Sequence, residues 1–131
     1  MAQLSITGLY LSLLGLLYVV LALKVVKLRT HFKVGIGDGG QGALARAIRV
    51  HGNFAEYTPI VILLLACAEL NGSHPMIIHF VGAAFFISRI IHSIGITKSQ
   101  GVTSFRSWGM IVSFLSIIVL ALENIRLFLF A

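Results

Sequence analysis

The fold is decided by an apolar run near the start of the chain, Leu4–Leu23, which reads LSITGLYLSLLGLLYVVLAL and contains no charged side chain. Roughly 20 such residues are enough to cross the hydrocarbon core of a bilayer as one α-helix. The basic residues Lys24, Lys27 and Arg29 follow the run. A cleaved signal peptide instead has its basic residues before a shorter apolar core. We therefore expect a retained membrane span.

The composition of the whole chain extends this interpretation. Of its 131 residues, 58% are hydrophobic and only 11% are charged, and the mean hydropathy is +1.00. A soluble domain has about 25% charged residues. A soluble enzyme and a disordered chain are excluded, and a single cysteine, Cys67, excludes a disulfide scaffold. The length suits a single all-α domain over 1–131, an integral membrane four-helix bundle with spans at about 4–28, 43–70, 75–96 and 107–128.

Two polar stretches separate the predicted spans on one side of the membrane. The first, from about Thr30 to Gly42, is rich in glycine around Asp38 and is typical of a loop. A phosphate-binding cradle is disfavoured there, because no strand precedes it and no Gly-Lys-Ser/Thr follows it. The second polar stretch runs from Thr97 to Ser107, and Trp108 then begins the fourth span as an interfacial aromatic residue.

The net charge of +6 comes from basic residues that gather beside these two loops, not from a polybasic tail, which argues against a nucleic-acid partner. The other side of the membrane has only Arg126 out of ten lysines and arginines. Positive residues favour the cytoplasmic side, so we expect both termini to face away from the cytoplasm. The nine residues beside the two loops are Lys24, Lys27, Arg29, Lys33, Arg46, Arg49, Arg89, Lys98 and Arg106.

Polar side chains form a stripe inside the second span. Arg46, Arg49, Asn53 and Glu56 are spaced by 3, 4 and 3 residues, which places them within about 80° of one another on a helix. Glu56 lies about 10 Å deeper than Arg49 and needs a cationic partner. Either the arginines anchor helix ends and pair with Glu56 structurally, or the stripe faces a ligand cavity or a partner helix.

Further polar residues lie at the same depth on other spans. Arg89 and His92 are one turn apart on the third span, and Arg106 enters from the second loop. Several guanidinium groups with one carboxylate and one amide suit a zwitterion with excess negative charge, and glutathione fits this description. An arginine would also stabilise its thiolate. His74 and His79 lie on the opposite side from His92, so no metal site is expected.

The second-span segment RAIRVHGNFAEYTP, residues 46–59, resembles the signature of the MAPEG family, the membrane-associated proteins in eicosanoid and glutathione metabolism. The segments RIIH (89–92) and Arg106-Ser107 are similar to that family's motifs in and after the third helix. The resemblance covers nearly the whole chain and is nearest to the bacterial branch, whose members lie in the inner membrane. It implies a homotrimer with glutathione bound between subunits at the cytoplasmic side. It also implies the following site residues: for glutathione Arg49, His51, Asn53, Glu56, Arg89, His92 and Arg29 or Lys27, and for thiolate stabilisation Arg106 with Ser107.

The resemblance further implies a membrane-bound enzyme of the glutathione transferase or peroxidase type. Its thiolate would attack a lipophilic electrophile that arrives through the membrane lipid, by conjugation, peroxide reduction or isomerisation. One departure is Ile96, which stands one turn after His92 where family enzymes often have a tyrosine, so one expected hydrogen bond to the tripeptide is lost. The alternative is a non-catalytic member that binds a lipid or a partner. A small drug exporter is disfavoured, because the first span has no acidic residue.

Overall fold

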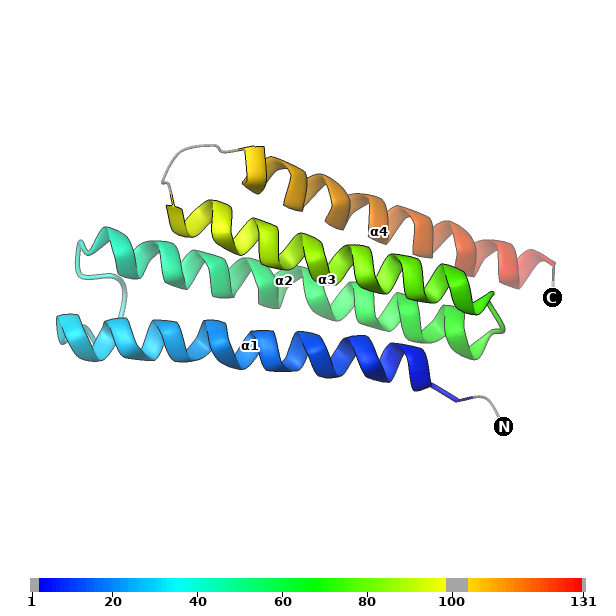
Figure 1. Cartoon of the computed structure of the whole chain (residues 1–131), viewed down its shortest axis with the longest axis horizontal. Coiled ribbons are helices and arrows are strands. Elements are labelled where there is room, and N and C mark those ends of the chain that lie inside the picture. Colours follow the sequence, from blue (N-terminus) through cyan, green and yellow to red (C-terminus); the bar gives the residue numbers. More distant parts are fainter. Residues whose placement is uncertain (1–2, 99–103, 131) are drawn as a thin grey trace.

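The computed structural model describes residues 3–98 and 104–130, and within them the chain forms four helices (Figure 1). They are α1 (Ser5–Phe32), α2 (Gly42–Leu70), α3 (Pro75–Lys98) and α4 (Ser104–Leu129). Each is long and apolar enough to cross a membrane. The expectation of an all-α, four-span membrane fold is confirmed.

Two helices are longer than the predicted spans. α1 continues through Phe32, beyond the expected start of the loop at Thr30, and ends where Lys33 adopts a left-handed conformation with φ 57°. α4 already begins at Ser104, inside the second predicted loop, and residues 99–103 of that loop lie outside the described residues. In both places the helix extends past the apolar segment through residues that include neither glycine nor proline, the two residue types that disfavour a helix most.

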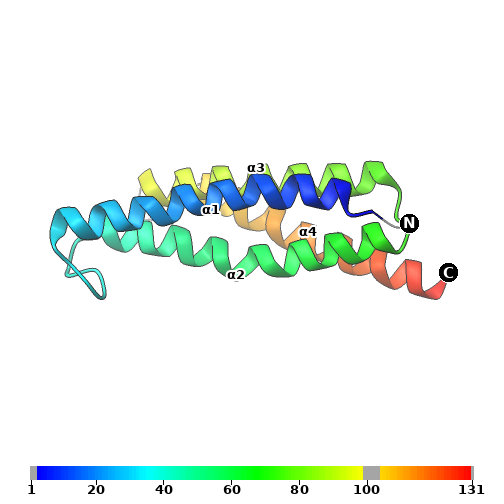
Figure 2. The same ribbon diagram turned by 90° about the horizontal axis from the view of Figure 1, so that it is seen from below.

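The helices run up and down, so that α1 begins and α4 ends at the same end of the bundle, where a short turn joins α2 to α3 (Figure 1). In Figure 1 α2 and α3 lie between α1 and α4, and Figure 2 shows the same bundle from below, from the side of α1. Within the described residues α1 and α4 make no direct contact. The core therefore follows the α2–α3 pair. Its most deeply buried apolar side chains are Leu14, Val61, Leu65, Ile78, Phe85 and Leu120.

Polar contacts close the end of the bundle that holds the α2–α3 turn. The carboxylate of Glu69, in the last turn of α2, accepts hydrogen bonds from the backbone amides of Ile6 (2.9 Å) and Thr7 (2.7 Å) at the start of α1. The first amides of a helix have no partner within the helix, and the positive end of its dipole favours an anion. Glu69 therefore caps a helix other than its own.

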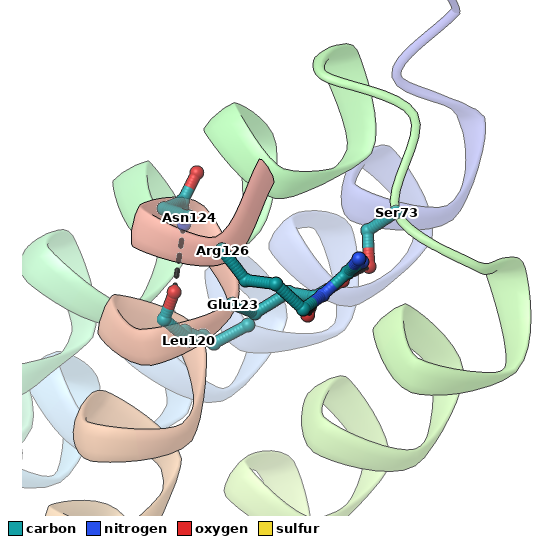
Figure 3. Close-up of polar contacts among 5 residues, drawn as sticks. All are labelled: Ser73, Leu120, Glu123, Asn124 and Arg126. Atoms are coloured by element: carbon teal, nitrogen blue, oxygen red, sulfur yellow. Dashed lines mark hydrogen bonds and ion pairs between the residues drawn. The ribbon is translucent and has the colours of Figure 1, made fainter. Parts of the chain in front are cut away.

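A second carboxylate at this end ties α4 to the turn, as Figure 3 shows. Glu123 is buried, accepts a hydrogen bond from the Ser73 hydroxyl (2.6 Å) and forms an ion pair with Arg126 at 2.8 Å. Beside it, the side-chain amide of Asn124 donates to the carbonyl oxygens of Leu120 (2.8 Å) and Leu64 (2.9 Å). Neither carboxylate was among the site residues predicted from the sequence.

Candidate functional site

The predicted stripe on α2 divides into an outward and an inward part. Arg49 and Glu56 lie seven residues apart on the outward side, and their side chains meet at 3.4 Å between Nη1 and Oε1. Both side chains remain more than half exposed, at 57% and 55%. The cationic partner that Glu56 requires is thus supplied by its own helix. The pair presents charge on a face of a membrane-spanning helix that no other part of the described chain covers.

The inward part of the stripe is Asn53, which is bound to Arg89 of α3. The Nη1 atom of Arg89 donates to the side-chain oxygen of Asn53 (2.8 Å). Its Nη2 atom donates to the carbonyl oxygen of Gly109 (3.0 Å) and to the hydroxyl of Ser113 on α4. Arg89 is only 1% exposed, so this guanidinium joins three helices inside the subunit.

Aromatic rings complete the surroundings of Arg89. Its guanidinium carbon lies 5.4 Å from the ring centre of Phe85 and 5.8 Å from that of Tyr57. Ring faces attract cations at such distances, most strongly where water is excluded. The Nε atom of Arg89 is buried and has no hydrogen-bond partner among the described residues. The arginine is therefore held by its outer nitrogens and by aromatic faces.

His92 connects α3 to the start of α4. Its Nδ1 atom lies 3.1 Å from the backbone carbonyl oxygen of Arg106, and a carbonyl only accepts, so Nδ1 is the donor. The Nε2 atom is buried without a partner among the described residues. This contact fixes the first turn of α4, on which Arg106 and Ser107 both lie half-buried.

The two remaining predicted ligands lie apart from the stripe. His51 packs its ring against Tyr18 of α1 with 4.8 Å between ring centres, which agrees with its expected position off the stripe. The Nη1 atom of Arg29 donates to three carbonyl oxygens of the following loop, those of Val34, Gly35 and Gly37, at 2.9–3.4 Å. Within the subunit Arg29 therefore holds the loop.

Ile96, the position where family enzymes often have a tyrosine, is 4% exposed and belongs to the apolar core. At the same end of the bundle, Asp38 accepts a hydrogen bond from the Gly40 amide at 2.9 Å and forms a local turn. The glycine-rich segment is thus a loop, as expected, and one of its amides is already used within that turn.

Sequence reasoning missed the contribution of α4 to the polar cluster. Gly109 and Ser113 are the acceptors for Arg89, and the spacing of two small residues by four is a recognisable signal for close packing of membrane helices. Glu123 and Arg126 were also detectable as opposite charges three residues apart on a helix.

The fold and the polar cluster define a multi-pass membrane protein whose four-helix bundle gathers arginine, asparagine, glutamate and histidine side chains near one end. A sequence model of the MAPEG family matches residues 7–126, and the chain belongs to that family. It is 33% identical over 120 residues to the inner membrane protein YecN of Escherichia coli strain K12, an alignment that covers 92% of this chain and 90% of YecN. The YecN protein of Escherichia coli O6:H1 gives the same identity and coverage.

Proposed function

We propose that the protein is an inner-membrane enzyme of the glutathione transferase or peroxidase type, which activates glutathione as a thiolate for attack on a lipophilic electrophile. Membership of the MAPEG family supports a membrane protein of that family, and the name of the relative YecN supports a location in the inner membrane. The observation that supports a ligand site most directly is the outward ion pair of Arg49 and Glu56 on α2. A half-exposed ion pair within a membrane span is costly unless a ligand or a partner helix covers it.

The chemistry of the outward pair suits the two ends of the glutathione molecule. A guanidinium binds a carboxylate with two parallel hydrogen bonds, and a carboxylate binds an ammonium group. In this proposal Arg49 takes a glutathione carboxylate and Glu56 takes its amine. Because the two side chains lie on the outer surface of one subunit, the opposite wall of the site comes from a second copy, which agrees with a homotrimer.

The inner residues have supporting roles in this proposal. Arg89 fixes the orientation of the Asn53 amide through their 2.8 Å hydrogen bond. His92 holds the first turn of α4 through the Arg106 carbonyl. In this proposal the Arg106 guanidinium on that turn stabilises the thiolate, assisted by the Ser107 hydroxyl. His51 and Arg29 would contribute at the edge of the ligand.

The second candidate function is non-catalytic binding of a lipid or a partner protein in the same fold. Two observations favour it over catalysis. Asn53 and Arg89 already satisfy one another within the subunit, and Ile96 is part of the core. Neither arrangement requires glutathione.

Ultraviolet titration of the purified protein with glutathione near neutral pH separates the candidates, because the thiolate absorbs where the thiol does not. The enzyme proposal expects a thiolate signal in the wild type and on the order of a tenfold smaller thiolate fraction in Arg106→Ala, with partial recovery in Arg106→Lys. Lys33→Gln, an exposed basic residue at the same end, is the matched control and should keep the signal.

Two results would contradict the enzyme. Glutathione binding by calorimetry without any thiolate signal would assign a non-catalytic binding function. If glutathione does not bind at all, the Arg49–Glu56 pair instead serves a contact between copies of the chain or binds another anionic ligand.

A further inference from the structure

A continuous apolar furrow runs along the outer side of the α3–α4 pair. Its widest part has a volume of about 720 Å³ and is lined by apolar side chains that include Phe80, Val81 and Val119. A second hollow of about 260 Å³ shares these three residues and continues to Ala84 and Val112. Because adjoining hollows share their walls, they form a single surface feature, which we call the α3–α4 furrow.

The length of the α3–α4 furrow matches one lipid chain. Helix α4 rises by roughly 20 Å between Val112 and Arg126 at about 1.5 Å per residue. Half of the hydrocarbon core of a bilayer is roughly 15 Å thick. An acyl chain of a single leaflet therefore fits along the furrow, with its headgroup at the end where α4 finishes.

That end of the furrow has the charged residues. Glu123 and Arg126 line it, and Glu123 is held by Ser73. The Glu123 carboxylate accepts hydrogen bonds from the Nε and Nη2 atoms of Arg126, both at 2.8 Å. These two bonds fix the plane of the guanidinium. The side chain of Arg126 is nevertheless 53% exposed, and within residues 3–98 and 104–130 its Nη1 atom has no partner.

The outer edge of Arg126 is suited to a phosphate. Guanidinium N–H groups bind phosphate oxygens strongly, and a guanidinium that is already oriented loses less freedom on binding. The N-terminus of α3 lies at the same place, since Met76, the second residue of that helix, lines the wide part of the furrow. Its dipole adds positive potential. The ion pair is neutral overall, so the charge pattern favours a phosphate diester attached to an apolar chain over a free anion.

We propose that the α3–α4 furrow binds one phospholipid per subunit, with its phosphate on the Nη1 edge of Arg126 and an acyl chain against Phe80, Val81 and Val119. The site lies at the opposite end of the bundle from Arg49 and Glu56 and is independent of the proposed glutathione chemistry. The phospholipid belongs to the leaflet on the side of the α2–α3 turn and stabilises the α3–α4 pair beside the larger hollow.

Native mass spectrometry of the full-length protein in detergent tests the site, with dioleoylphosphatidylglycerol and dioleoylglycerol added as probes. We expect one tightly retained phosphatidylglycerol per subunit and weak binding of dioleoylglycerol, which has the same chains but no phosphate. Arg126→Gln should weaken phosphatidylglycerol binding roughly tenfold. Val119→Trp, which fills the furrow, should abolish binding of both lipids.

Matched variants separate the furrow from general effects. Val19 of α1 is as exposed as Val119 (51% against 44%), so Val19→Trp should retain the lipid, as should Lys33→Gln. Arg126→Gln leaves the buried Glu123 carboxylate without its ion-pair partner. The double variant Glu123→Gln/Arg126→Gln replaces both charges with amides, so it should fold. It should bind phosphatidylglycerol as weakly as Arg126→Gln does. Equal retention by Val119→Trp and Val19→Trp, equal binding of both lipids, or cross-linking of Val119→Cys to a second copy of the chain would each overturn the proposal.

Discussion

Arg89 is the side chain on which the polar end of the subunit depends. It is buried among three helices, and its hydrogen bonds reach Asn53 on α2 and both Gly109 and Ser113 on α4. A buried cation is costly unless hydrogen bonds and nearby groups compensate for the lost water. Acceptors from α2 and α4 bind the two Nη atoms of Arg89, and the rings of Phe85 and Tyr57 lie beside its guanidinium. Arg89 therefore stabilises the mutual position of α2, α3 and α4.

Replacing Arg89 with methionine keeps much of the apolar volume and removes every donor. We expect Arg89→Met to lower the free energy of unfolding by about 1–3 kcal/mol, because Asn53 loses its buried partner. Unfolding in mixed detergent and sodium dodecyl sulfate, followed by circular dichroism, measures the change. Arg46→Met, at a half-exposed position on α2, is the control and should change stability by less than about 0.5 kcal/mol. An equal loss in both variants would contradict the role given to Arg89.

The division of the stripe shows how far residue-scale reasoning reaches. Helical spacing predicted one stripe for Arg49, Asn53 and Glu56, and the structure divides it into an exposed edge with Arg49 and Glu56 and a buried edge with Asn53. Spacing alone does not say which edge of an 80° stripe faces a neighbouring helix. That choice depends on where α3 places Arg89, which is a property of the packed bundle. The sequence therefore predicted that Asn53 and Arg89 belong to the cluster. It did not predict that Arg89 binds Asn53 while Glu56 pairs with Arg49, nor that Gly109 and Ser113 supply acceptors.

The helices α3 and α4 approach most closely where their small residues meet. A Cβ atom placed on Gly109 would lie 2.5 Å from the Cβ atom of His92 and 2.9 Å from the carbonyl oxygen of Ser88. The hydroxyl groups of Ser88 and Ser113 are 3.3 Å apart across the same contact. Without a hydrophobic driving force between helices in lipid, such close packing and interhelical hydrogen bonds hold them together.

Gly109→Ala should therefore separate α3 from α4. We expect a loss of about 1–3 kcal/mol in the free energy of unfolding, as for overpacking of a filled core. Gly15→Ala is the matched change, because a Cβ atom there meets nothing within 4 Å. That variant should be neutral or stabilising by up to about 1 kcal/mol. A destabilisation in Gly15→Ala as large as that in Gly109→Ala would show that the close contact is not the cause.

At the scale of helices, hydropathy was sufficient to place all four, because each needs an apolar length close to the thickness of the bilayer. The helix ends were harder to predict. α1 ends at the left-handed Lys33, whose conformation accompanies a hydrogen bond from the Val34 amide to the Arg29 carbonyl (3.0 Å). Outside the hydrocarbon core polar residues can continue a helix, so hydropathy does not mark its last turn.

The whole molecule has its basic residues at one end and its chain ends at the other. Figure 1 shows α1 beginning and α4 finishing beside the α2–α3 turn, whereas the 33–41 loop lies at the far end. With nine of ten lysines and arginines on the side of the 33–41 loop, the charge distribution predicts that this loop is cytoplasmic.

Cysteine labelling in whole cells tests the predicted orientation. In a Cys67→Ala background, Asn71→Cys in the α2–α3 turn should react with a membrane-impermeant maleimide. Ile36→Cys, which is 94% exposed in the loop after α1, should react only after the membrane is permeabilised. The reverse pattern would show that the termini face the cytoplasm. Equal labelling of both in intact cells would indicate two orientations in one population.

The structure of one chain gives little information on whether and how copies of it assemble. α1 and α4 lie on opposite sides of the α2–α3 pair, and large parts of both face outward (Figure 1). In a membrane such faces are satisfied equally well by lipid or by another subunit. Among the described residues, the outward charges of Arg49 and Glu56 favour another copy of the chain or a ligand, since they are unfavourable against lipid.

The cap that Glu69 forms on α1 bears on how the protein enters the membrane. Glu69 is in the last turn of α2, so it is synthesised more than sixty residues after the amides of Ile6 and Thr7 that it binds. α1 can cross the bilayer alone, but its first turn gains this partner only when α2 has returned to the same side. The N-terminal cap of α1 therefore forms only when α1 and α2 pair as a helical hairpin. In a nascent chain arrested before Glu69, the first turn of α1 would lack this cap and would fray.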